Sequence, residues 1–348
     1  MRSGFYKERY GQLVGLSDSP AVWAWVGVLV AVLVAAPFLL GPYPLGMLTV
    51  ILFTLVGVLG LTILTGFTGL ISLGHVAFLM IGAYAYAIGV SRLHLPPVLA
   101  LLLATGVPAV FGLIVGLPSL RLHGLYLAIT TLAFTFIINQ LILSGGKFTG
   151  AGGGMPVQRP TLAGISLAGE RPFYFFCLLS AVLAVLATLN LRRTRVGRAL
   201  VAIRDNDIAA RTMGINLWTH KLLAFVLCAC FTGFAGALMA MHIGFVNTEG
   251  FPFLLSIEAL AIIIVGGIGS VLGAVLGTVF IVLLPEAFSL AVGALGTGVS
   301  DFLNTSANEI KSMLYGVAII GFLMFDPRGL RGIWHDLRHA WVHWPLRF

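Results

Sequence analysis

Charged residues are scarce in this sequence. Asp, Glu, Lys and Arg make up 9% of its 348 residues, against 59% hydrophobic residues, whereas a soluble domain carries about 25% charged residues. No charge lies between Asp18 and Arg92, and further charge-free runs cover 93–120, 172–191, 222–248 and 259–285. A chain of this length cannot bury so much apolar surface in a water-soluble core. The runs are apolar on all sides, not alternating, which excludes a transmembrane β-barrel and predicts helices that span a bilayer.

Several kinds of chemistry are also missing. The three cysteines, Cys177, Cys228 and Cys230, all lie in apolar runs, which excludes a zinc site or a disulfide framework built from them. No phosphate-binding Gly-x-x-x-x-Gly-Lys-Ser/Thr pattern is present, because the one Gly-Lys pair is followed by Phe148. No set of acids, bases and nucleophiles indicates an enzyme. We therefore expect no metal and no cofactor in this chain, and any ATP that it uses must be bound by another protein.

The fold class that we predict is an all-α membrane protein, a polytopic bundle of about ten transmembrane helices. The expected spans are 21–40, 45–65, 75–91, 97–117, 124–143, 173–190, 221–243, 254–266, 270–290 and 311–325. The net charge is +8, and the basic residues cluster beside these spans. This position indicates that they face a lipid surface and do not bind nucleic acid.

Basic residues predict the orientation through the positive-inside rule. The loop 191–220 and both tails are rich in arginine, so we expect all three in the cytoplasm. Ten spans satisfy this, whereas nine spans, with 254–290 as one helix, would place the C-terminal tail outside. The predicted organisation is an N-terminal tail over 1–20, a transmembrane domain over 21–325 and a C-terminal tail over 326–348. The loops 144–171 and 244–253 then both lie on the outer side.

Two glycine-rich segments interrupt the apolar pattern, one in each half of the chain. They run from Gly66 to Gly74 and from Gly266 to Gly273. Paired breaks of this kind indicate a transport pathway, although close helix packing is a second explanation for the glycines. Polar groups inside spans are costly and are often functional, although bonding between helices is a common use of them. The candidate pathway residues are Gly66, Gly69, Ser72, Gly74, His75, Thr130, Thr131, Asn139, Glu258, Gly266, Gly267 and Gly269.

The loop 191–220 contains a predicted short helix near 206–213. Asp205 or Asn206 can cap its first turn, Asp207 and Arg211 match the helix dipole, and Gly214 fits the position after the last turn. A short cytoplasmic helix with a surface of small residues can dock in a groove of a partner. The alternative is an interfacial helix that rests on lipid head groups.

A series of motifs, in order from about Gly57 to Leu330, resembles the permeases of branched-chain amino acid ABC transporters. These motifs include Gly69-Leu-Ile-Ser-Leu-Gly-His75, 120–132, Gly197-Arg-Ala-Leu-Val-Ala-Ile-Arg204, Gly233-Phe-Ala-Gly-Ala237, Val265-Gly-Gly-Ile-Gly-Ser270 and Phe325-Asp-Pro-Arg-Gly-Leu330. One departure is the outer loop from Gly150 to Pro156, where family members often carry a polar residue among the glycines. Permeases for urea and short-chain amides share much of the pattern, which leaves the substrate class open.

The resemblance implies a multi-pass protein of the bacterial inner membrane that works with several partners. These are a second, homologous permease subunit, two cytoplasmic ATP-binding subunits and a periplasmic or lipid-anchored substrate-binding protein. The segment 206–214 then corresponds to the coupling helix that contacts the ATPase. The residues assigned to ATPase coupling are Arg198, Arg204, Asp205, Asp207, Ala209, Ala210, Arg211 and Gly214.

Two other classes of function compete with this interpretation. An ion- or proton-coupled secondary transporter acting alone would use Glu258 and His75 as its coupling groups. A membrane-embedded enzyme has little support, because no convergent catalytic residues are found in the sequence.

Overall fold

The computed structural model describes residues 20–119, 122, 124–150, 153–162, 165–293, 307–325, 329–334 and 336. The predicted tails, 1–20 and 326–348, therefore lie mostly outside the described residues. The longer helices are α2 (Pro20–Leu39), α3 (Pro42–Leu61), α4 (His75–Ser91), α5 (Pro97–Ser119), α6 (Leu125–Ser144), α7 (Glu170–Arg193), α10 (Leu217–Ile243), α11 (Leu254–Gly266), α12 (Val271–Gly293) and α14 (Ala307–Phe325). Shorter helices are η1 (Thr62–Phe67), η2 (Gly146–Phe148), α8 (Arg195–Asp205), α9 (Asp207–Thr212) and η3 (Thr248–Gly250).

These helices confirm the predicted all-α membrane bundle but not the count of ten spans. Within the described part of the chain, seven helical stretches are long and apolar enough to cross a membrane, among them Pro42–Phe67, which joins α3 to η1. The other three predicted spans coincide with shorter apolar helices, at Gly27–Leu39, His75–Ser91 and Ser312–Phe322. Hydropathy located the helices well because each apolar run is bounded by proline, glycine or charge.

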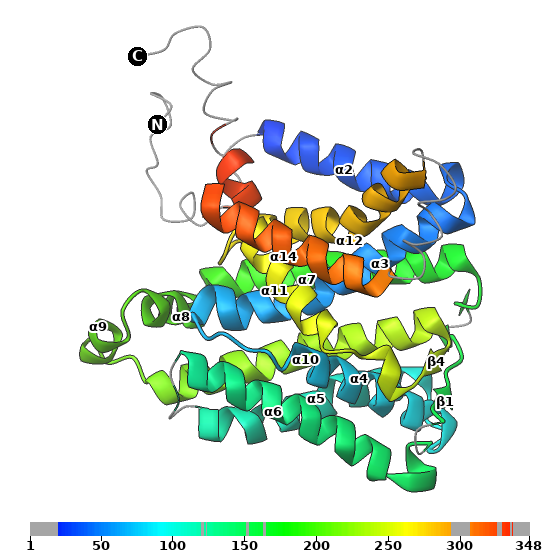
Figure 1. The fold of residues 1–348 in the computed structure, drawn as a ribbon, viewed down its shortest axis with the longest axis horizontal. Helices are drawn as coiled ribbons and strands as arrows, with labels where there is room; N and C mark the ends of the chain where they lie inside the picture. Colours follow the sequence, from blue (N-terminus) through cyan, green and yellow to red (C-terminus); the bar gives the residue numbers. More distant parts are fainter. Residues whose placement is uncertain are drawn as a thin grey trace, which may run out of the picture.

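The two ends of the bundle differ in structure. Helices α8 and α9 project from one end, and the short strands β1 (Met155–Pro156) and β4 (Phe245–Val246) lie at the other (Figure 1). These strands pair antiparallel, with Met155 opposite Val246. A second pair, β2 (Thr161–Leu162) with β3 (Ile165–Ser166), belongs to the same loop as β1. The β1–β4 pairing confirms that the loops 144–171 and 244–253 lie at the same end.

Helix α10 packs against α3, α4 and α5, and α4 also packs against α5. Their closest approaches are made by glycines, as expected where helices pack in lipid. A Cβ on Gly82 of α4 would overlap the carbonyl oxygen of Gly233 on α10, and one on Gly236 would overlap the carbonyl oxygen of Leu79. The backbones of α4 and α10 therefore touch directly.

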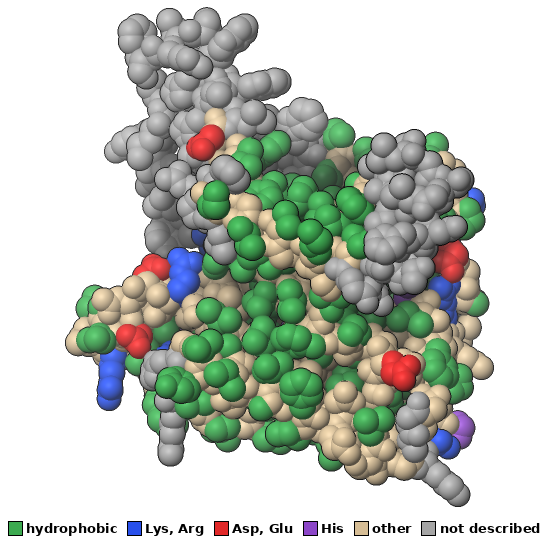
Figure 2. Space-filling view, viewed as in Figure 1, with side chains coloured by type: hydrophobic (Ala, Val, Ile, Leu, Met, Phe, Trp, Pro, Cys, Tyr) green, Lys and Arg blue, Asp and Glu red, His purple; other side chains and the backbone are tan. Residues whose placement is uncertain are grey.

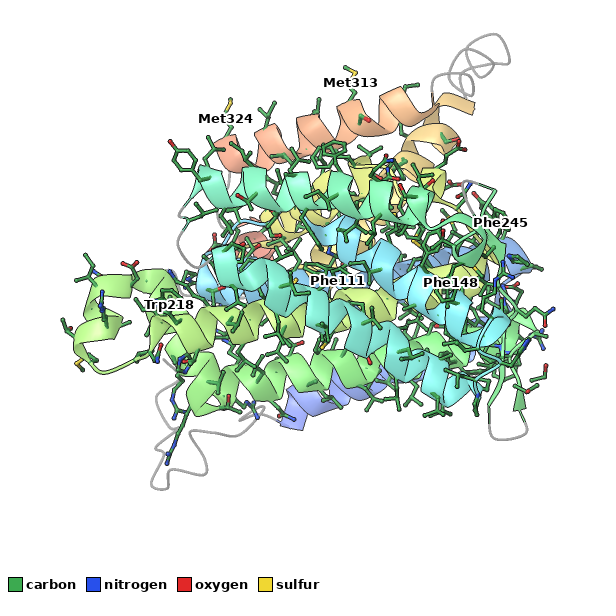
Figure 3. The ribbon with its side chains drawn as sticks, turned by 90° about the horizontal axis from the view of Figure 1, so that it is seen from below. Phe111, Phe148, Trp218, Phe245, Met313 and Met324 are labelled. Carbon is green, nitrogen blue, oxygen red and sulfur yellow. The ribbon has the colours of Figure 1, made fainter. Side chains whose placement is uncertain are left out.

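The outer surface of the bundle is apolar. Side chains such as Leu102 on α5, Phe136 on α6 and Leu183 on α7 are more than half exposed. In Figure 2, hydrophobic and uncharged surface covers the middle of the face shown, and charged side chains lie toward the two ends. In Figure 3, Met313 and Met324 point outward from α14. An apolar belt between two polar ends is the surface expected of a protein in a bilayer.

Candidate functional site: two broken segments and a projecting loop

The first glycine-rich segment breaks the helix as predicted. Helix α3 continues into the π-helix η1, which ends at Phe67, and α4 begins at His75. Gly69, between them, has φ +73°, a left-handed backbone that favours glycine. The chain thus leaves one helix and enters the next through irregular backbone, in which Leu70 and Ser72 are buried while Gly69 and Ile71 are exposed.

Side chains from distant helices satisfy the backbone of this first break. The amide of Leu73 donates to Thr131 Oγ1 of α6 over 2.9 Å, and the amide of Val76 donates to Ser256 Oγ of α11 over 3.1 Å. The Leu70 carbonyl accepts from Thr65 Oγ1 over 3.0 Å. Irregular backbone at membrane depth needs such partners because lipid supplies none.

The second break lies between α11 and α12, at Gly266–Gly269, as predicted. Gly267 and Gly269 have φ +107° and +79°. Ser270 caps α12, because its Oγ accepts from the Gly273 amide over 2.8 Å. A Cβ on Gly266 would overlap the Gly273 carbonyl oxygen, so α11 and α12 form a hairpin that only small residues permit.

The two breaks, far apart in the sequence, touch in space. A Cβ on Gly66 would lie 2.9 Å from Gly269 Cα, and one on Gly269 would lie 2.8 Å from the Gly66 carbonyl oxygen. Gly329, beyond α14, packs against the second break, since a Cβ added to Gly329 would lie 2.7 Å from the Gly267 amide nitrogen. The two halves of the chain therefore meet at their glycine segments, a contact that neither segment predicts by itself.

His75 lies in the interior of the subunit. It is 4% exposed, and its Nδ1 lies 3.5 Å from Thr232 Oγ1 of α10. Gly57 of α3 packs against its ring, because a Cβ there would lie 3.3 Å from His75 Cε1. Ser72, 1% exposed, caps the turn before α4 by accepting from the Gly74 amide. In this conformation His75 and Ser72 support the first break from within.

The polar residues of α6 do not share one face. Thr130 and Asn139 are nine residues apart, two and a half turns of an α-helix, so they project from opposite sides. Thr130 Oγ1 bonds to its own helix at the Tyr126 carbonyl. Asn139 Oδ1 is buried and lacks a hydrogen-bond partner among the described residues. Only one of these two residues can therefore face a given pathway.

Glu258 on α11 is half-buried and pairs with α14. Its carboxylate accepts a hydrogen bond from the hydroxyl of Tyr315, which is 4% exposed. A second carboxylate makes a similar contact: Tyr43, in the first turn of α3, donates to Glu286 Oε1 of α12 over 2.5 Å. The carboxylates of α11 and α12 thus each join two helices.

The projecting loop contains the predicted short helix, α9. Asn206 caps it, because its Oδ1 accepts from the Ala209 amide over 3.0 Å, and Gly214 follows with φ +82°. Ile208 and Met213 are 74% and 83% exposed, whereas Ala210 is buried. The contact surface that α9 offers is therefore an apolar tip flanked by Asp207 and Arg211, and Ala210 supports it from beneath.

The preceding helix, α8, was missed by the sequence analysis. Thr194 caps it, since its Oγ1 accepts from the Gly197 amide over 3.2 Å, and a threonine at this position was the signal that could have revealed it. Gly197 packs against the end of α7, where a Cβ would overlap the Leu191 carbonyl oxygen. Helix α8 is thus fixed to the bundle while α9 extends beyond it.

Within α8, two arginines predicted to contact an ATPase lie differently. Arg198 donates to the carbonyl of Arg193 in the adjacent helix end over 2.8 Å and is exposed. Arg204 instead donates from Nη1 to the Gly66 carbonyl over 2.9 Å, while Nε and Nη2 donate to Asp205 Oδ1. Arg204 and Asp205 therefore connect the loop to the first break.

At the opposite end, Arg159 ties the loop 144–171 to α10. Its guanidinium donates to the Met241 and His242 carbonyls over 3.2 and 3.4 Å, at the C-terminus of that helix. It also pairs with Glu170 over 2.9 Å and stacks 4.7 Å above the Phe173 ring. A cation suits the last turn of a helix, where carbonyls are free.

A cleft of about 340 Å³ lies between α4, α5 and α6, and its lining includes Phe148 and Thr149 of the same loop. Its lining includes Tyr84, Phe111, Ile138 and Phe148 and is almost entirely apolar. Figure 3 labels Phe111 and Phe148, which come from α5 and from η2, just after α6. A surface of this kind suits hydrocarbon better than a polar solute.

Comparison with known proteins agrees with this arrangement. Residues 43–323 match the family described as "Branched-chain amino acid transport system / permease component". The chain is 32% identical to the high-affinity branched-chain amino acid transport system permease protein LivM of Salmonella typhimurium, over 87% of this chain and 73% of the relative. Identity to LivM of Escherichia coli strain K12 is also 32%, over 87% and 74%.

More distant relatives belong to a different import system. The chain is 30% identical to the autoinducer 2 import system permease protein LsrC of Salmonella paratyphi B, over 57% of this chain and 54% of the relative. No solved structure is significantly similar to the chain. The family match covers most of the chain, both breaks and the projecting loop, and the chain belongs to the branched-chain amino acid transport system permease family.

Proposed function

We propose that this chain is the transmembrane permease subunit of an ABC importer, and that it moves branched-chain amino acids across the bacterial inner membrane. The observation that carries the proposal is the similarity to LivM along 87% of the chain. The family is one of transport components, so the role is passage of a solute and not catalysis. The two touching breaks and the projecting loop are features that such a role requires.

The energy comes from ATP bound by other subunits. The chain lacks the phosphate-binding pattern in its sequence, and α9 offers an exposed apolar tip at Ile208 and Met213. An apolar tip between an acidic and a basic side chain fits a groove on a protein better than it fits lipid head groups, which favour clustered cations. Helix α9 is thus the coupling helix, and its contact residues are the tip residues Ile208 and Met213 with Asp207, Ala209 and Arg211 beside them.

The importer contains further subunits. A second, homologous permease covers part of the apolar surface of the bundle, two ATP-binding subunits dock on the α9 end, and a substrate-binding protein delivers solute to the β1–β4 end. The opposite characters of the two ends support this assignment, because basic residues concentrate around α8 and α9. Both tails lie in the cytoplasm, with α2, α4 and α14 completing ten spans.

The pathway runs along the two breaks. Gly69, Gly267 and Gly269 belong to irregular backbone, and Gly66 lies in the last turn of η1, where the carbonyls are free of partners within the helix. A passing solute can reach such polar groups without disrupting a helix. Gly69 is exposed, whereas Gly66, Gly267 and Gly269 are buried where the breaks touch, so opening the pathway separates them. Asn139, with its unpaired buried oxygen, and Glu258 are the side chains best able to bind the polar part of an amino acid.

The test is uptake by the purified complex. The tagged chain, co-expressed with its ATP-binding subunits and partner permease, is reconstituted in proteoliposomes with the binding protein outside. We expect radiolabelled leucine to accumulate only when ATP is enclosed. Accumulation of urea or a short-chain amide in place of leucine would contradict the substrate assignment. Leucine uptake driven by a proton or sodium gradient without ATP would contradict the class of transporter.

A further inference from the structure

We propose that Arg204 is the positioning residue that transmits movement of the coupling loop to both glycine breaks. The inference rests on the proposed function, because it concerns how an ATPase that grips α9 changes the pathway. It assigns Arg204 an inward role, distinct from contact with the ATPase. Arg204 is the last basic residue of α8, and two residues separate it from the start of α9 at Asp207.

The contacts of Arg204 reach both halves of the subunit. Its Nη1 donates to the Gly66 carbonyl over 2.9 Å. A Cβ on Gly69 would lie 3.0 Å from Arg204 Cγ, and a Cβ on Gly269 would overlap Nη1. The side chain therefore lies across the first break and against the second, in space that exists because these positions are glycine.

The Gly66 carbonyl is a good acceptor for this arginine. Gly66 lies in the last turn of η1, where carbonyls lack partners within the helix and where a positive charge is favoured. A hydrogen bond from a guanidinium to such a carbonyl is charge-assisted and stronger than a neutral one. The contact thus holds the end of η1 to α8.

Asp205 holds the guanidinium in this orientation. Its Oδ1 accepts from Nε over 3.1 Å and from Nη2 over 3.0 Å, which leaves Nη1 for Gly66. The Arg204 side chain is 32% exposed and that of Asp205 is 62% exposed. The pair lies at the surface of the bundle, where α8 and the breaks can move together as one body.

Arg195 provides a matched control on the same helix. It has the same charge and is exposed, but it lies nine residues, or two and a half helical turns, before Arg204 and therefore projects from the opposite side of α8. If the arginines of α8 served only to attract lipid or an ATPase, replacing either one would have the same effect. If Arg204 transmits movement, only its replacement separates ATP hydrolysis from uptake.

The first experiment measures leucine uptake and ATP hydrolysis in proteoliposomes with the whole complex. In Arg204→Ala we expect hydrolysis to continue while leucine moved per ATP falls about tenfold, the effect of losing one charge-assisted hydrogen bond. Arg204→Lys keeps the positive charge without the planar fork and should recover part of the ratio. Arg195→Ala should keep the wild-type ratio. An unchanged ratio in Arg204→Ala, or an equal loss in Arg195→Ala, would overturn the inference.

A second experiment replaces the hydrogen bond by a covalent one within the same protein. A Cβ on Gly69 would lie 3.7 Å from Arg204 Cβ, which suits a disulfide, whose Cβ atoms lie about 3.8 Å apart. In a background without the native cysteines, Gly69→Cys/Arg204→Cys is compared reduced and oxidised, so both states share one folding history. Oxidation should raise the leucine moved per ATP, whereas the single variant Arg204→Cys should not respond. No increase, or a decrease, on oxidation would refute a transmitting role.

The wild-type complex separates the two proposals. If it shows no ATP-driven uptake of leucine, the proposed function fails. If it transports leucine and the Arg204 variants remain coupled, only the inference about Arg204 fails.

Discussion

Replacing Gly82 by alanine should loosen the centre of the bundle. The new Cβ would overlap the Gly233 carbonyl oxygen and lie 2.5 Å from Gly233 Cα. Carbon atoms normally pack about 3.5 Å apart or more, so α4 and α10 must separate by roughly 1 Å. Overpacking of this kind costs about 1–3 kcal/mol, and we expect the upper part of that range because both clashing groups are backbone.

The separation should also impair transport. Thr232, the neighbour of Gly233, lies 3.5 Å from His75 at the start of α4. Moving α10 away from α4 therefore disturbs the support of the first break. We expect Gly82→Ala to lower the thermal unfolding temperature in detergent and to reduce ATP-driven leucine uptake together.

Gly106 supplies the control, since it lies on α5 in a helix of similar apolarity with nothing within 4 Å of an added Cβ. There alanine should be neutral or stabilising by up to about 1 kcal/mol, through helix propensity alone. If Gly82→Ala unfolds at the same temperature as Gly106→Ala and transports leucine equally well, the direct backbone contact between α4 and α10 is wrong.

Two further predictions concern the projecting loop and the orientation. Gly214→Ala should lower the stability of the loop by about 1 kcal/mol, the cost of a left-handed backbone for a side chain, and no steric clash adds to this cost because nothing lies within 4 Å of an added Cβ. The same change should reduce the stimulation of ATPase activity by substrate-loaded binding protein more than Gly214→Asn does. Equal stimulation in both variants would show that the end of α9 tolerates either residue. The orientation is tested with a membrane-impermeant maleimide. In intact cells it should label Glu249→Cys, and it should label Ile208→Cys and Ala340→Cys only after lysis. Labelling of residue 340 from outside would exclude ten spans.

Local chemistry made much of this protein predictable. Scarcity of charge determined a helical membrane protein, because lipid accepts only segments that satisfy their own backbone. The start of α4 at His75, the cap of α9 at Asn206 and the turn at Gly214 follow from hydropathy and from side chains next to the affected backbone. Such features need no knowledge of what packs against them.

The relations between helices could not be found in this way. In a span that is apolar on every side, hydropathy does not show which face meets which neighbour. Sequence therefore could not show that Thr131 and Ser256 would support the first break. Thr130 and Asn139 looked equivalent in sequence, yet the helix turns them to opposite sides.

The sequence by itself determined that both halves contain a glycine break and that a capped helix lies between them in a basic loop. Only the tertiary structure decided that Gly66 and Gly269 touch and that Arg204 bridges toward both. The physical reason is that a glycine allows close approach by any neighbouring backbone, and a long arginine side chain can reach several different acceptors. Which contact forms depends on how the whole bundle packs.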